Sequence, residues 1–106
     1  MISRIWHGYT THENAGKYET LLREEIFTEI SKKNIKGYCG IRLLRRELEN
    51  ETEFITIMQF DSIAAVKEFA GSDYEAAVVP EKAQKVLSRY DGKSQHYDVI
   101  ADDIRQ

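Results

Sequence analysis

Glu53-Phe54-Ile55-Thr56-Ile57-Met58-Gln59-Phe60 is the stretch that decides the fold of this chain. Alternate residues of a β-strand point to opposite faces, and here neither face is strongly polar. One face carries Phe54, Thr56, Met58 and Phe60, and the other carries Ile55, Ile57 and Gln59. A strand covered by helices on one side only normally has a polar second face. We therefore expect helices on one side of the sheet and a second copy of the chain on the other.

The segments that flank this strand predict its neighbours. Upstream, Tyr38 to Leu48 reads as a strand, and the polar turn Glu49-Asn50-Glu51 joins the two as a hairpin. Downstream, Asp61-Ser62 is a helix N-cap signal. The helix that follows ends at Gly71, and its apolar stripe consists of Ile63, Val66, Phe69 and Ala70.

A strand and a long helix are expected before the hairpin. Ile2 to Gly8 reads as a strand with Ile2, Arg4 and Trp6 on one face and Ser3, Ile5 and His7 on the other. Thr10-Thr11-His12-Glu13 matches a capping box, in which glutamate follows threonine by three residues. It predicts a helix to about Lys33, whose apolar stripe consists of Tyr18, Leu21, Leu22, Ile26 and Ile30.

The last part of the chain predicts a final helix and strand. Pro80 suits a first helical position, and the helix would bury Ala83, Val86, Leu87 and Tyr90. Ser94 to Ile100 reads as a strand, and we expect residues 101–106 to form a frayed tail. Right-handed crossovers place the third and fourth strands on either side of the first. The prediction is one α+β domain over residues 1–100, a ferredoxin-like split βαβ unit with a four-stranded antiparallel sheet.

Composition narrows the function classes. The formal net charge is −3, and nucleic-acid binders usually show a basic surplus. Cys39 is the only cysteine, so no internal disulfide forms, which favours a reducing compartment. The N-terminus lacks the apolar run of a signal peptide, and no stretch approaches the roughly 20 apolar residues of a membrane span. We expect a cytoplasmic protein with neither nucleic acid nor membrane as partner.

Several segments together resemble the antibiotic-biosynthesis-monooxygenase-like domains. These are the opening Ile2-Ser3-Arg4-Ile5-Trp6-His7-Gly8, the helix entry Phe60-Asp61-Ser62 with its end Phe69-Ala70-Gly71, and the closing Ser94-Gln95-His96-Tyr97. The resemblance implies a homodimeric α+β barrel, in which two four-stranded sheets face each other and helices lie outside. It also implies a pocket between sheet and helices, where some members oxidise polyphenolic or quinol substrates without metal or flavin.

Haem-degrading relatives of that superfamily are a poorer match. They use an asparagine on the first strand, a tryptophan in the second helix and a histidine shortly after it. These positions correspond here to His7 or its neighbour, to Phe69, and to Val78 or Val79. Because valine offers no nitrogen ligand for iron, we expect no haem chemistry and no cofactor.

The candidate site residues follow from what cofactor-free oxygenation requires. A base must remove a phenolic proton, and histidine suits that task near neutral pH. His7 is the first candidate and His96 the second, while Trp6, Tyr38, Phe69 and Tyr74 are candidate pocket-lining residues. The plainer alternatives are a histidine that caps the sheet edge and aromatic residues of the core or an interface. Ligand spacing for a metal is lacking, so no metal site is predicted.

Two arginines within strands also have two readings. Arg4 and Arg42 could steady a substrate oxyanion or pair with a glutamate across the sheet.

The leading hypothesis is a cofactor-independent monooxygenase that acts on a small aromatic or quinol-like metabolite. The alternatives are a non-catalytic ligand-binding or stress-response barrel, and an isomerase or lyase that uses the same pocket.

Overall fold

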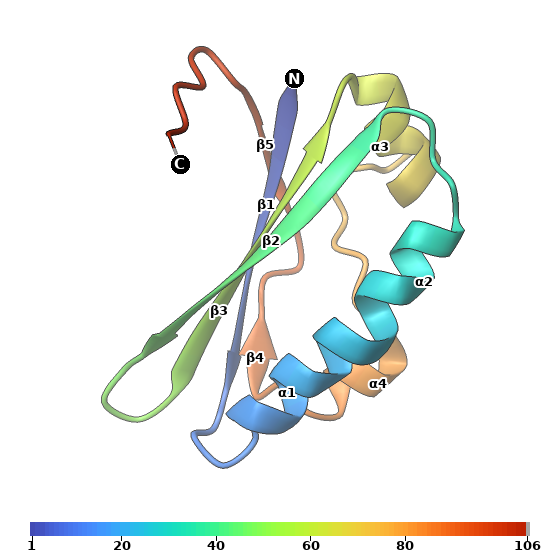
Figure 1. Ribbon diagram of the computed structural model, residues 1–106. Helices are drawn as coiled ribbons and strands as arrows, with labels where there is room; N and C mark the ends of the chain where they lie inside the picture. The colour runs from blue at the N-terminus through green and yellow to red at the C-terminus, as the bar shows by residue number, and fades with distance from the viewer. Residues whose placement is uncertain (106) are drawn as a thin grey trace.

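The computed structural model describes residues 1–105 and consists of an antiparallel sheet with helices on one face (Figure 1). The central strand is β1 (Ile2–Thr10), which pairs along its whole length with β3 (Thr52–Phe60). β2 (Tyr38–Glu47) flanks β3 on the outside. The hairpin between β2 and β3 is confirmed, and the amide of Leu48 donates to the Glu51 carbonyl at 2.8 Å.

The other edge of the sheet differs from the prediction, because it contains two short strands. β4 (Arg89–Tyr90) pairs with one end of β1 and β5 (Gln95–Asp98) with the other, so the sheet formed by residues 1–105 has five strands. Between them the Asp91 carbonyl accepts a hydrogen bond from the Trp6 indole at 2.8 Å. The chain therefore leaves the ladder after Tyr90 and rejoins it at Gln95. The predicted positions of the third and fourth strands beside the first are confirmed.

The long helix between the first two strands starts later than the capping box predicts. It consists of α1 (Ala15–Leu21), a π-helical turn η1 (Leu22–Ile26) and α2 (Phe27–Lys32). Thr10 is not its N-cap: it is the last residue of β1, where it pairs with Thr52 and is fully buried. The capping-box prediction was wrong because pairing in the sheet takes Thr10, and Thr11 instead accepts from the Asn14 amide at 3.2 Å.

The second predicted helix is confirmed and the third is shorter than expected. α3 (Ile63–Ala70) begins at Ser62, whose hydroxyl accepts from the Ala65 amide at 3.2 Å. α4 (Glu81–Gln84) ends before Leu87, and Tyr90 lies in β4 with 39% of its surface exposed. The prediction that Tyr90 is a buried helical residue was wrong. Ser88 binds the Tyr9 carbonyl through its amide and hydroxyl, at 2.8 and 3.0 Å, which draws the chain to the sheet edge.

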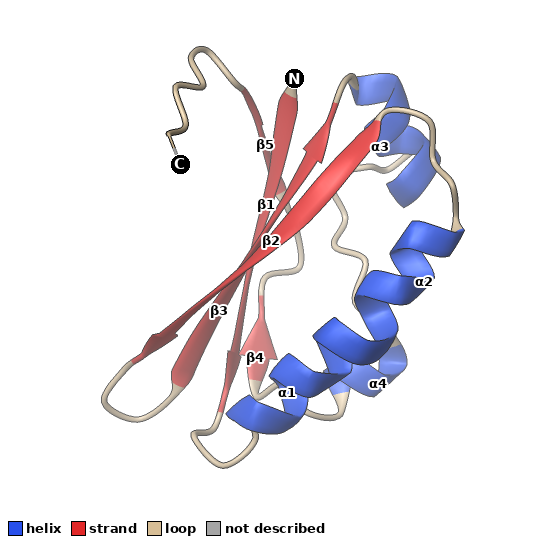
Figure 2. Cartoon of the chain, in the orientation of Figure 1, coloured by secondary structure: helices blue, strands red, loops and turns tan. Residues whose placement is uncertain are grey.

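All helices lie on one face of the sheet, and Figure 2 shows the other face without any helix. The covered side holds the core, where Tyr18, Phe54, Phe60 and Val66 are fully buried. On the open face Ile5, Ile55 and Ile57 remain half-buried. The predicted one-sided cover is thus confirmed. Residues 101–105 are irregular and exposed, and within residues 1–105 no helix is long and apolar enough to cross a membrane.

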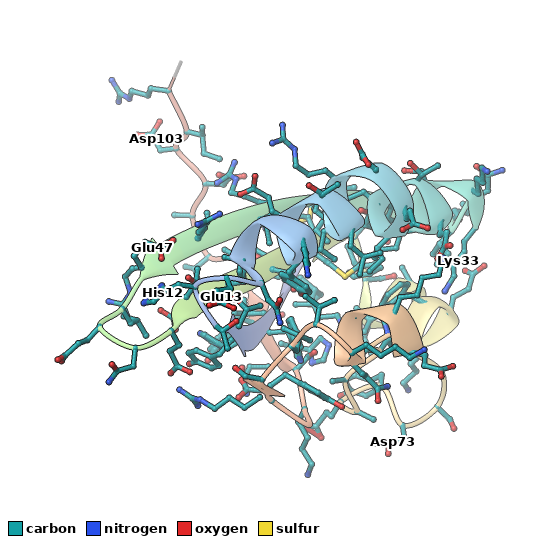
Figure 3. The ribbon with its side chains drawn as sticks, turned by 90° about the horizontal axis from the view of Figure 1, so that it is seen from below. His12, Glu13, Lys33, Glu47, Asp73 and Asp103 are labelled. Atoms are coloured by element: carbon teal, nitrogen blue, oxygen red, sulfur yellow. The ribbon has the colours of Figure 1, made fainter. Side chains whose placement is uncertain are left out.

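Hydrogen bonds of the His12 ring link the turn before α1 to the β2–β3 hairpin (Figure 3). Its Nδ1 lies 3.0 Å from the Glu47 carboxylate and its Nε2 lies 3.1 Å from the Glu49 carbonyl. Because both ring nitrogens face acceptors, the contact favours the doubly protonated imidazolium. The pKa of His12 is raised accordingly, first by the Glu49 carbonyl and then by Glu47.

Candidate functional site

An apolar cavity lies between the covered face of the sheet and the helices. Trp6, Met58 and Thr56 line it from the sheet, while Leu22, Phe27 and Phe69 line it from the helices. The space open to the centre of a water molecule is about 60 Å³. That is room for a few waters, at roughly 10–15 Å³ each, whereas pockets for drug-sized ligands have volumes of about 300–1,000 Å³. An aromatic ring therefore requires side chains to move when it enters.

Among residues 1–105, Arg4 is the one charged side chain in the cavity wall. It is only 3% exposed. Its Nη1 donates to the Tyr74 carbonyl at 2.5 Å and to His96 Nε2 at 2.9 Å, and its Nη2 donates to the Ala76 carbonyl at 3.1 Å. No carboxylate of residues 1–105 forms an ion pair with it. Burial lowers the pKa of Arg4, yet a guanidinium remains a cation in proteins.

His96 lies behind Arg4 and is held as a neutral base. A guanidinium can only donate, so the 2.9 Å contact requires a lone pair on His96 Nε2 and places the ring proton on Nδ1. The pKa of His96 is lowered, first by burial and then by the charge of Arg4, with Glu75 opposing. The ring also packs edge-on against Tyr74 at 5.1 Å between centroids. His96 itself does not line the cavity.

The predicted pocket residues divide into two pairs. Trp6 and Phe69 line the cavity. The Arg4 guanidinium lies 5.6 Å and the Lys33 ammonium 4.9 Å from the centroid of the Phe69 ring, over its face. Tyr38 and Tyr74 lie outside it. Tyr38 packs on Phe60 at 5.5 Å, and Tyr74 supports His96.

His7 lies on the opposite face of the sheet from the cavity. It pairs with Ile55 in the register of β1 and β3, and its Nδ1 is 3.3 Å from the Asp91 carboxylate. Both side chains are about one-third exposed, at 31% and 39%. The two candidate bases are therefore separated by the sheet, and only His96 is connected to the cavity wall. Residues 1–105 contain no cluster of three His, Cys, Asp or Glu side chains suited to a metal ion.

Sequence reasoning did not find three polar residues of the cavity, Tyr18, Thr56 and Ser94. Tyr18 is 1% exposed, and burial raises its pKa, so its hydroxyl stays protonated and can donate. The sequence does indicate that Arg4 faces the covered side, because it is in phase with the apolar residues Ile2 and Trp6 along β1. Thr56 is likewise in phase with Phe54 and Met58 along β3.

Comparison with solved structures supports the fold. No family profile and no curated protein matches the chain. Among solved structures, a Bacillus cereus protein described provisionally as an antibiotic biosynthesis monooxygenase superposes with a TM-score of 0.65 at 12% identity. The match covers 98% of this chain and 97% of the other. The chain therefore has the α+β, ferredoxin-like fold of antibiotic-biosynthesis-monooxygenase-like domains.

Proposed function

We propose that this protein is a small cofactor-independent monooxygenase, which oxidises an aromatic or quinol-like metabolite in the cavity between sheet and helices. The observation that carries the proposal is the pairing of a neutral imidazole with a buried cation at an apolar cavity. Trp6 and Phe69 supply aromatic walls, and Arg4 and His96 supply the polar chemistry. The likeness in fold to the Bacillus cereus protein supports the same reading.

The chemistry requires one proton transfer before oxygen reacts. A phenolic hydroxyl that displaces the Nη1 hydrogen bond can donate to His96 Nε2, which takes its proton. The guanidinium of Arg4 then stabilises the phenolate oxygen. The phenolate reduces O₂, one oxygen atom joins a ring carbon, and the other leaves as water when the O–O bond breaks. A phenol and O₂ thus give a quinone and water, and the apolar walls keep bulk water from the reactive anion.

A homodimer is part of this proposal. The open face of the sheet carries Ile5, Ile55 and Ile57, each half-buried in the single chain. Burial of apolar surface is worth about 25 cal/mol per Å², so a facing sheet from a second copy would stabilise this surface. The paired sheets would form the α+β barrel that the fold suggests.

A non-catalytic barrel that binds a ligand, or acts in a stress response, is the second candidate. The observation that favours it is the small cavity, which at about 60 Å³ is nearly filled by its own side chains. An isomerase or lyase with His96 as the proton shuttle uses the same residues, but it would consume no oxygen.

Oxygen uptake with a panel of hydroquinones, in the presence of a metal chelator, tests the proposal. We expect uptake to depend on folded protein and to fall when Val78→Trp narrows the cavity, since Val78 lines it and is 45% exposed. Ile100→Trp is the matched control, because Ile100 is 91% exposed and lies outside the cavity. Binding of hydroquinones without uptake would favour the second candidate, and substrate turnover without uptake would favour the isomerase or lyase.

A further inference from the structure

The proposed function does not account for the group that balances the buried charge of Arg4. A buried charge is costly unless it is paired. The contacts of Arg4 are two backbone carbonyls, an imidazole that must be neutral, and the face of Phe69. Glu75 acts on the pKa of His96 but forms no ion pair with Arg4. Within residues 1–105 this cation therefore has only uncharged partners.

The guanidinium also retains donors for a ligand. It has five N–H groups, and three of them make the hydrogen bonds described above. The N–H of Nε and the second N–H of Nη2 have no acceptor among residues 1–105. Nε and Nη2 are neighbouring nitrogens on one edge of the planar guanidinium, and such an edge can bind both oxygens of a carboxylate.

We infer that the ligand of this cavity is an aromatic monocarboxylate, whose carboxylate pairs with Arg4 while its ring lies between Trp6 and Phe69. This inference rests on the site of the proposed function and names the class of its substrate. A monoanion matches the positive charge of Arg4 in the cavity wall, whereas a phosphate dianion would leave one charge unpaired in an apolar site. The small cavity favours a single ring.

The test compares two compounds that differ only in the carboxylate, 2,5-dihydroxybenzoate and 1,4-dihydroxybenzene. Isothermal titration calorimetry under nitrogen measures binding without oxidation. We expect wild-type protein to bind the acid about tenfold more tightly or better, because hydrogen bonds to a charged group are the strong ones. Trp6 is the only tryptophan and lines the cavity, so a change in its fluorescence on binding locates the ligand.

Two variants then assign the preference to one side chain. Arg4→Met should reduce the affinity for the acid to that for the neutral compound. Arg23→Met is the matched control, because Arg23 is exposed on η1 and lies outside the cavity, and it should leave both affinities unchanged. The comparison of the two compounds on wild-type protein stands even if Arg4→Met fails to fold.

Equal affinities, a preference for the neutral compound or no binding of either would overturn the inference. Oxygen uptake in air separates the inference from the proposed function. Tight binding of the acid without uptake would overturn the oxidation and leave the inference intact. Uptake with the neutral quinol, without any preference for the acid, would overturn the inference and leave the oxidation intact.

Discussion

The two faces of the sheet carry similar side chains in very different surroundings. On the covered face Arg4 and His96 are held at 2.9 Å beside an apolar cavity. On the open face His7 is partly exposed and faces Asp91 at 3.3 Å. Exposed ion pairs contribute little because water and salt screen them, whereas burial alters the acid–base behaviour of the covered pair. The position of a residue on the strand therefore decides its chemistry more than its type does.

β1 shows the contrast within one strand. Its even-numbered residues, including Arg4 and Trp6, are buried, while its odd-numbered residues, including Ile5 and His7, are half-exposed. A single-residue slip in register would exchange the two sets. Substitutions on one face of the sheet at a time can therefore test the role proposed for that face.

The largest expected effect is on oxidation rate. His96→Gln should lower oxygen uptake by about 10²- to 10⁴-fold, which is the usual contribution of a positioned general base. His7→Gln should leave the rate unchanged, because the side chain lies on the other face. Circular dichroism confirms that each variant is folded. A loss of rate in His7→Gln with normal activity in His96→Gln would place the reaction on the open face.

The next effect is on assembly. We expect light scattering at micromolar concentration to give twice the 12.3 kDa mass of one chain. Ile57→Glu on the open face should separate the dimer or unfold it, because a buried unpaired charge costs several kcal/mol. Thr20→Glu, on the exposed side of α1, is the control and should leave the mass unchanged. A wild-type mass near 12.3 kDa would contradict the facing-sheet dimer.

A smaller effect concerns the pH dependence of stability, where two histidines should act in opposite directions. The folded-state pKa of His96 lies below 6.5, so its contribution is present above pH 6.5 and is lost as pH falls through the lowered value. The pKa of His12 lies above 6.5, so its contribution is present below pH 6.5 and is lost as pH rises through the raised value.

Thermal unfolding between about pH 5 and pH 8 measures both contributions. His96→Gln should remove part of the acid-side loss in melting temperature, and His12→Gln should remove part of the loss on the alkaline side. The reverse pattern would show that the proton positions on the two rings are misassigned.

The last prediction is that haemin does not form a specific complex with this protein. Val78 and Val79 line the cavity, and the family resemblance aligns them with the histidine of haem-degrading enzymes. Among residues 1–105 the cavity wall contains no histidine. Titration followed by the Soret band should give no saturable one-to-one complex. A complex that turns over with a reductant would contradict this expectation.

Local patterns were sufficient where neighbours along the chain decide the conformation. The alternation from Glu53 to Phe60, the Ser62 cap and the stripe that contains Tyr18 all predict their elements, because each depends on a periodicity of a few residues. The Thr10 capping box failed because a sheet partner 42 positions away competed for the same residue. The interruption between β4 and β5 was missed because it depends on the Trp6 indole.

The sequence by itself determined the α+β class, the one-sided helical cover and the face on which each residue of β1 lies. The tertiary structure alone decided that Arg4 meets His96, which is 92 positions away, and that no carboxylate of residues 1–105 forms an ion pair with Arg4. Strand register across such distances results from the packing of the whole core, and no short window of residues encodes it. The site therefore became visible only when the register of β5 against β1 placed His96 opposite Arg4.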